Sequence, residues 1–212
     1  MKQRKPYQIA DAAAERITSR IHKEFRHNRL AMFDEMNVVQ IKKHVRKLYN
    51  TSYKIVLKQM SDIVNLIYEE IYDEALALGF DGDLRDLDEG WVEEFFDEYN
   101  PLTKFVFSNE FDRKESRLFE SLVASTKERH QSYKTAERLL TRQIKQYCIE
   151  LEDKVLRTVY KDLGVKKVRW VTEQDHRTCG VCNELDGQIF TLDDAPPKQH
   201  WLCRCYLMPV RE

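Results

Sequence analysis

Apolar residues recur at spacings of three and four along most of the chain, which is the period of an amphipathic helix. The longest such stretch covers residues 37–78 and is followed by Gly79, and glycine commonly follows the last turn of a helix. A second long stretch covers residues 133–163. A shorter one covers residues 11–30, with Asp11 as the expected N-cap. Apolar stripes of this length predict long helices that pack as antiparallel or coiled-coil pairs.

Shorter segments fill the middle of the chain. Residues 81–98 are acidic, and their apolar residues fall at helical spacing, so they predict an amphipathic helix with a solvated acidic face. A carboxylate cluster that binds a divalent cation or mimics DNA is the alternative for this segment. Residues 102–107 are a dense apolar run that fits either a strand or a buried turn, and residues 112–125 predict another helix.

The pattern changes after Gly164. Residues 166–172 alternate between polar and apolar side chains, as a strand does, and residues 189–190 and 205–208 predict two more short strands. Asp186-Gly187 is a typical signal for a tight β-hairpin turn. The sequence therefore predicts a mostly α fold with a small C-terminal α+β module, divided into a long-helix region over residues 1–164 and the module over residues 165–212.

Composition and charge exclude some functions. The chain has 212 residues, of which 42% are hydrophobic, and its 35 lysines and arginines almost balance its 36 aspartates and glutamates. A protein that coats nucleic acid through its overall electrostatic field would carry a positive net charge. Basic side chains on the predicted helices alternate with glutamates, so we expect at most weak DNA contact. No apolar run approaches the roughly 18–20 residues of a membrane span. The basic N-terminus has no apolar segment behind it, which is unlike a secretory signal and predicts a cytosolic protein.

Four of the five cysteines are concentrated near the C-terminus. Cys179 and Cys182 form a C-x2-C pair, and Cys203 and Cys205 follow His200 as H-x2-C-x-C. Such spacing is typical of a tetrahedral Zn²⁺ site, in which one close pair of thiolates is completed by a second pair from a distant segment. The fifth cysteine, Cys148, lies on the apolar face of the predicted helix over residues 133–163, and we expect it to be a core residue.

Three interpretations of this cluster remain open. In the first, a structural Zn²⁺ takes four ligands from the five candidates; we favour the four cysteines over a set containing His200, provided that the chain turns between Cys203 and Cys205. In the second, the site is catalytic, with Asp175, His176 and His200 as the base and ligands of a hydrolase or nuclease. In the third, the cysteines form disulfides under oxidising conditions outside the cell.

The same segment resembles the C-terminal signature of the phage head morphogenesis family, the Mu F-like minor head proteins. The resemblance rests on an ordered set of residues: Trp170, Asp175, Arg177-Thr178-Cys179, Cys182, Leu185-Asp186-Gly187, Phe190, Pro197, His200, Cys203-Arg204-Cys205 and Pro209. It implies a non-enzymatic minor head protein of a tailed phage or prophage, located in the head interior of the virion after assembly in the host cytoplasm. Its implied partners are the portal protein and other head proteins, and its implied role is in capsid assembly, DNA packaging or ejection. A metal-dependent nuclease or a zinc-ribbon DNA-binding module is the alternative.

Overall fold

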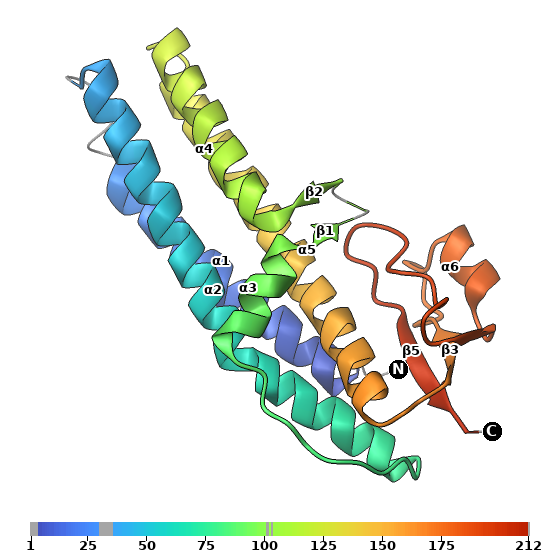
Figure 1. Ribbon diagram of the computed structural model, residues 1–212. Helices are drawn as coiled ribbons and strands as arrows, with labels where there is room; N and C mark the ends of the chain where they lie inside the picture. The colour runs from blue at the N-terminus through green and yellow to red at the C-terminus, as the bar shows by residue number, and fades with distance from the viewer. Residues whose placement is uncertain (1–3, 30–35, 101, 103, 212) are drawn as a thin grey trace. The chain divides into compact units, whose positions relative to one another are not determined.

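The computed structural model describes residues 4–29, 36–100, 102 and 104–211, and it is mostly helical with a small antiparallel sheet near the C-terminus (Figure 1). The elements are α1 (Lys5–Arg29), α2 (Val38–Ala77), α3 (Glu89–Asp97), β1 (Tyr99–Asn100), β2 (Phe105–Val106), α4 (Phe107–Ala124), α5 (Arg129–Asp162), β3 (Lys167–Val171), α6 (Gly180–Leu185), β4 (Ile189–Thr191) and β5 (Tyr206–Val210). This order confirms the predicted fold class of long helices followed by a small α+β module.

The ends of α2 follow from local chemistry. Asn37 and Gln40 form a reciprocal cap, because the Gln40 amide donates to Asn37 Oδ1 at 3.0 Å and the Asn37 amide donates to Gln40 Oε1 at 2.9 Å. Gly79 follows the helix with a φ of 83°, which glycine adopts without strain. The expected N-cap at Asp11 is wrong. Helix α1 already begins at Lys5. Pro6 is compatible with this early start, because the backbone nitrogen of a residue in the first helical turn has no intrahelical hydrogen bond to lose.

The acidic segment is helical over only half of its predicted length. Helix α3 begins at Glu89, whereas residues 81–88 are irregular. The side chain of Asn65 on α2 explains part of the difference, because it donates to the Leu87 carbonyl oxygen at 3.1 Å and accepts from the Leu87 amide at 2.7 Å. The backbone of Leu87 therefore has partners outside a helix. The apolar run that follows contributes β2, which pairs antiparallel with β1.

The chain divides into two compact units, and α1, α2 and α5 each contribute to both. One unit joins the start of α1 to Ser61–Asp88 and Gln146–Glu212, and the other contains Ala13–Met60 and Glu89–Lys145. The second unit has an aromatic core in which the rings of Phe96 and Phe107 lie 4.6 Å apart and those of Phe107 and Phe111 lie 5.1 Å apart. In the first unit α2 and α5 contribute buried aliphatic residues at helical spacing, namely Ile67, Ile71, Val155 and Val159.

The C-terminal sheet has the order β4-β3-β5 with antiparallel pairing throughout. The central strand β3 alternates as predicted, with Val168 and Trp170 buried. The prediction of a tight hairpin at Asp186-Gly187 is wrong. These residues end α6 and lead into β4, and Gly187 has a φ of 78°, which suits a position just past a helix.

Helix α5 supports this sheet from within the same unit. The guanidinium group of Arg157 donates to the carbonyl oxygens of Ala195 at 3.2 Å and Pro196 at 2.8 Å, in the loop between β4 and β5. The buried hydroxyl of Tyr160 donates to the Leu207 carbonyl oxygen in β5 at 3.1 Å. The module is thus built onto the C-terminal half of α5. Among the described residues, the helices are too short or too polar for any of them to span a membrane.

Candidate metal centre

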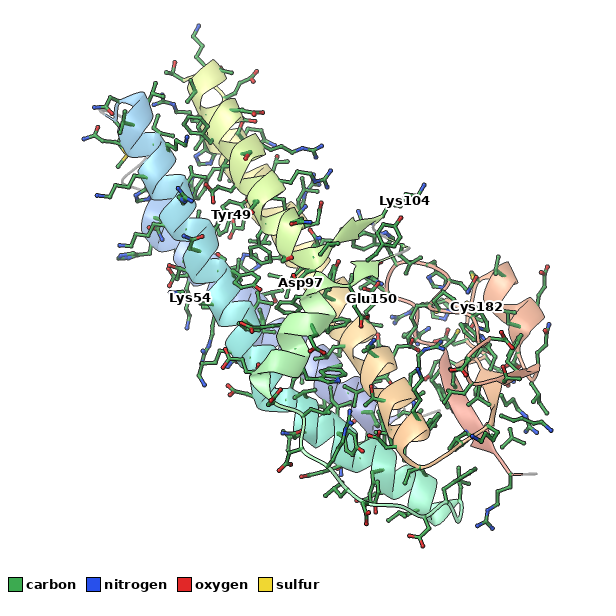
Figure 2. All side chains as sticks on the ribbon, viewed as in Figure 1. Tyr49, Lys54, Asp97, Lys104, Glu150 and Cys182 are labelled. Carbon is green, nitrogen blue, oxygen red and sulfur yellow. The ribbon has the colours of Figure 1, made fainter. Side chains whose placement is uncertain are left out.

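The first cysteine pair lies at the start of α6. Cys179 is the N-cap residue, and its sulfur accepts a hydrogen bond from the Cys182 amide at 3.4 Å. Cys182 is fully buried and Cys179 is partly exposed. Figure 2 marks Cys182 within the C-terminal module.

The second pair follows a turn that precedes β5. The Cys203 amide donates to the His200 carbonyl oxygen at 3.2 Å, and Leu202 inside this turn has a φ of 58°. Cys203 and Cys205 are both buried, and neither lies in a strand. This turn precedes Cys203, and the sulfurs of Cys203 and Cys205 lie within 4.8 Å of each other and of the Cys182 sulfur. The condition for both sulfurs to reach one site is therefore met.

The structure brings all five predicted candidates together. Their donor atoms form two overlapping groups, each with members within 4.8 Å of one another: Cys179, Cys182 and His200 in one, and Cys182, Cys203 and Cys205 in the other. The sulfurs of Cys182 and Cys203 lie 3.7 Å apart. Tetrahedral Zn²⁺ with bonds of about 2.3 Å to sulfur requires its ligand sulfurs to be about 3.8 Å apart. The cluster could therefore hold a metal ion, and Cys182 is common to both groups.

His200 has one ring nitrogen engaged. Its Nδ1 lies 3.0 Å from the carbonyl oxygen of Trp201. An Nδ1–H that donates to this carbonyl leaves Nε2 unprotonated, which is the tautomer that a metal-binding histidine needs. His200 thus remains compatible with ligation.

Electrostatics separate the three thiols of the second group. A hydrogen bond from Cys205, together with the positive charge of Lys198, lowers the pKa of Cys203 to about 5 despite its burial. Burial and the neighbouring Cys203 raise the pKa of Cys182 to about 12. The contact with Cys203 and burial also raise the pKa of Cys205 above its usual value. Three thiolates this close can be ionised together only when a cation offsets their repulsion, as a bound metal ion does.

A buried ionic network lies next to the cysteines. The Lys198 side chain is 3% exposed, and its ammonium group donates to the Cys205 carbonyl oxygen at 2.6 Å and to Glu152 Oε2 at 3.3 Å. Burial alone would lower the pKa of Lys198, but Glu152 and Asp153 raise it above its usual value, so the ammonium stays charged. Arg4 binds the other oxygen of Glu152 at 3.2 Å. Lys198 thereby places a positive charge beside ligands that are negative when ionised.

Asp175 precedes the first cysteine pair and is engaged structurally. Its Oδ1 accepts from the Arg204 guanidinium at 2.6 Å and from the Arg177 amide at 2.9 Å. The hydrogen bond from Arg204 is the main reason why the pKa of Asp175 falls to about 2. The side-chain partner of Asp175 is therefore Arg204, and Arg177 contributes only its backbone N–H. His176 is exposed, and it belongs to neither donor group.

The remaining cysteine is separate from the cluster. Cys148 on α5 is fully buried and belongs to neither donor group, which confirms its prediction as a core residue. Sequence reasoning missed Lys198, Glu152 and Gln146, which surround the site. The contact of Lys198 with Glu152 and that of Gln146 with Leu202 join residues 46 and 56 positions apart, so no local spacing could have indicated them.

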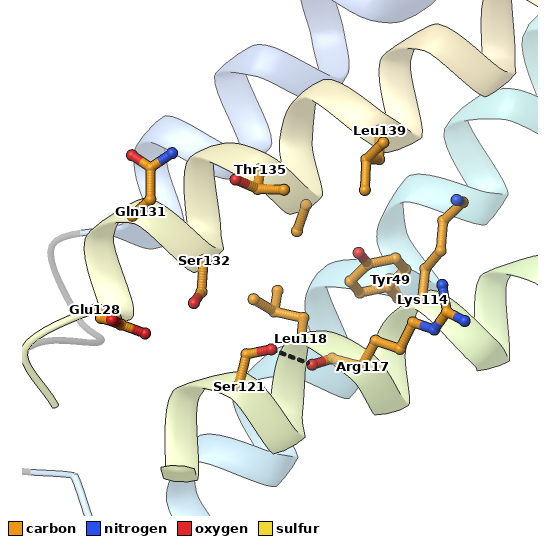
Figure 3. Close-up of a pocket in the computed structure, with 11 residues that line it drawn as sticks. Tyr49, Lys114, Arg117, Leu118, Ser121, Glu128, Gln131, Ser132, Thr135 and Leu139 are labelled. Atoms are coloured by element: carbon orange, nitrogen blue, oxygen red, sulfur yellow. Dashed lines mark hydrogen bonds between the residues drawn. The ribbon is translucent and has the colours of Figure 1, made fainter. Parts of the chain in front are cut away.

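A pocket of about 450 Å³ lies between α4 and α5 in the other compact unit (Figure 3). Its lining includes Tyr49, Lys114, Leu118 and Leu139. The buried Tyr49 hydroxyl has no hydrogen-bond partner among the described residues. Lys114 is already 3.6 Å from Glu110, and burial lowers the pKa of Lys114. None of the predicted site residues lines this pocket, so the cysteine cluster is the stronger candidate for function.

Fold and site together define a mostly helical protein whose small C-terminal module gathers four cysteines and a histidine in two overlapping groups that share Cys182. The sequence profile of the family described as Phage Mu protein F like protein matches residues 118–208, which contain all five candidate ligands. This match confirms the resemblance seen in the sequence and supports a phage head protein, with other head proteins as associates and the virion as its location. No curated protein and no solved structure matches the chain significantly.

Proposed function

We propose that this chain is a non-enzymatic minor head protein of a tailed phage or prophage. It associates with the portal vertex, enters the head interior during assembly in the host cytoplasm, and assists capsid assembly, DNA packaging or ejection. The observation that carries the proposal is the family match over residues 118–208, because it covers the module with its full set of candidate ligands. The long helices, including α2, are the proposed partner-binding surface.

The metal in the module is proposed to be structural Zn²⁺. Cys179, Cys182, Cys203 and Cys205 are the proposed ligands, and a set in which His200 replaces one cysteine is the alternative. A thiolate-rich set of this kind is typical of zinc sites that stabilise a fold. A module of this size has a small core of its own, and a metal ion supplies folding free energy that the core lacks.

A structural role agrees with the groups around the site. Four protein ligands leave no position on the metal for an activated water. Asp175 is bound by Arg204, and a carboxylate with a pKa of about 2 is too weak a base to take a proton near neutral pH. The proposed four-ligand shell and the observed pairing of Asp175 both support the non-enzymatic assignment.

Metal analysis tests the zinc proposal. Purified, reduced protein should contain about one Zn²⁺ per chain, since one site has been proposed. Cys182→Ser should release it, because Cys182 belongs to both donor groups. Cys148→Ser is the matched control, since Cys148 is equally buried but lies outside the cluster, and it should retain the metal. Protein that is prepared without chelators and contains no metal would rule the proposal out and favour disulfides.

Co-sedimentation tests the assembly role. The purified protein should sediment with portal rings or procapsids, and a variant lacking the residues after Gly164 shows whether the module contributes. Folded, metal-loaded protein that sediments neither with portal rings nor with procapsids would contradict portal association.

A further inference from the structure

The turn that carries Cys203 is held by a side chain from α5. Gln146 is fully buried, and its carboxamide oxygen accepts the Leu202 amide hydrogen at 2.6 Å. Its carboxamide nitrogen donates to Glu150 Oε1 at 2.6 Å, so the orientation of the Gln146 amide is fixed from the other side. Gln146 therefore links the helix directly to the residue that precedes a proposed metal ligand.

Leu202 needs such a contact because its backbone is strained. Its φ of 58° is in the left-handed region, which is unfavourable for a residue with a Cβ and persists only when the surroundings fix it. Leu202 as a whole is 44% exposed, so burial provides little restraint. The hydrogen bond to Gln146 acts on the backbone itself. It is thus well placed to hold the turn in its strained conformation.

We propose that Gln146 is a positioning residue of the metal centre, a role that rests on the proposed zinc site. By fixing the Leu202 backbone, it sets the direction from which the Cys203 sulfur approaches the Cys182 sulfur, now 3.7 Å away. If the turn relaxed, Cys203 would have to be reordered each time the metal bound. Outer-sphere partners of this kind typically change metal affinity about 10–100-fold when they are removed.

The chain offers a matched control for the test. Gln143 lies on the same helix and is 3% exposed, and its carboxamide atoms have no hydrogen-bond partner among the described residues. Gln146→Leu and Gln143→Leu therefore make the same chemical change at buried sites, but only the first removes a contact with the turn. Zn²⁺ affinity is measured by competition with a chromophoric chelator. We expect Gln146→Leu to bind Zn²⁺ about 10–100-fold more weakly and Gln143→Leu to match the wild type.

A double variant tests the hydrogen bond itself. Gln146→Glu combined with Glu150→Gln exchanges the two groups, keeps the net charge, and retains an acceptor for the Leu202 amide. We expect this exchange to restore most of the affinity lost in Gln146→Leu. The absorption bands of bound Co²⁺ should be altered in Gln146→Leu and return towards the wild-type spectrum in the exchange variant, which a general loss of stability would not produce.

The outcomes distinguish a failure of the proposed zinc site from a failure of the positioning role of Gln146. Wild-type protein that binds no Zn²⁺ would overturn the proposed metal function, and the role of Gln146 with it. Wild-type protein that binds Zn²⁺ while Gln146→Leu binds it equally well would overturn the positioning role alone. If Gln146→Leu does not fold, hydrogen exchange in the wild type decides: a Leu202 amide that exchanges as fast as in an unfolded peptide contradicts the role, and a protected amide supports it.

Discussion

Replacement of Lys198 by methionine tests whether the ionic network beside the candidate metal centre stabilises the fold. Lys198 and Glu152 have side-chain exposures of 3% and 1%, so Lys198→Met leaves a carboxylate in a buried environment. Breaking one partner of a buried ion pair typically costs about 3–5 kcal/mol. Arg4 still contacts Glu152 at 3.2 Å, which partly offsets the loss. We therefore expect a decrease of about 3 kcal/mol in the free energy of unfolding, at the lower end of that range.

The control is another lysine of the same unit in a different environment. Lys161 lies 3.9 Å from Asp193, and the two side chains are 66% and 87% exposed. An exposed pair contributes about 0–1 kcal/mol, so Lys161→Met should change stability little. Both variants are compared by urea unfolding at neutral pH in the presence of Zn²⁺, followed by circular dichroism.

A double-variant cycle separates the ion pair from lost packing. Glu152→Gln in the Lys198→Met background removes the carboxylate that would otherwise be left without its lysine. We expect a coupling energy of about 1–3 kcal/mol between the two positions. A cost for Lys198→Met as small as that for Lys161→Met would refute the reasoning, because it would mean that Lys198 is hydrated or uncharged in the folded protein.

Three further predictions concern other parts of the molecule. Burial, with a contribution from Asp11, raises the pKa of Tyr7 to about 12. The stabilising contribution of the protonated Tyr7 hydroxyl should be complete below pH ~10 and should be lost as the pH rises towards about 12. An ultraviolet titration that compares the wild type with Tyr7→Phe and finds a midpoint near 10 for Tyr7 would contradict this. A chelator should melt the residues after Gly164 and leave most helical circular dichroism intact, whereas a single collapse of helix content would contradict the proposed boundary at residue 165. DNA binding should be weak and lost near physiological salt, and nanomolar binding there would favour the DNA-binding alternative.

The sequence predicted those parts of the fold that depend on neighbouring residues. The span of α2 follows from its apolar period and from its ends at Asn37 and Gly79, and both are local signals. The alternation of β3 is local as well. The candidate site was predictable because cysteines are rarely grouped without a cause, so their spacing alone indicated a shared centre.

The errors arose where a distant contact decides the local structure. Residues before Glu89 have helical periodicity, but the Asn65 side chain forms hydrogen bonds with both the backbone N–H and the carbonyl oxygen of Leu87. Asp186-Gly187 has the composition of a hairpin turn, but α6 places it at a helix end. Lys198 looks like an ordinary surface lysine in the sequence, and only the packing of the module on α5 shows it to be buried. Pockets such as the one beside Tyr49 depend on how helices pack, which periodicity does not report.

The different pKa values of the clustered thiols have a consequence for how a metal ion would bind at this cluster. Cys182, with a pKa of about 12, and Cys205, whose pKa is also raised, carry protons at neutral pH in the metal-free protein. Ligation through both sulfurs would expel both protons into the solvent. Each expelled proton makes the apparent affinity about tenfold stronger per pH unit, so two protons give about a hundredfold. Loading of the apoprotein would therefore acidify an unbuffered solution and be favoured by mildly alkaline conditions.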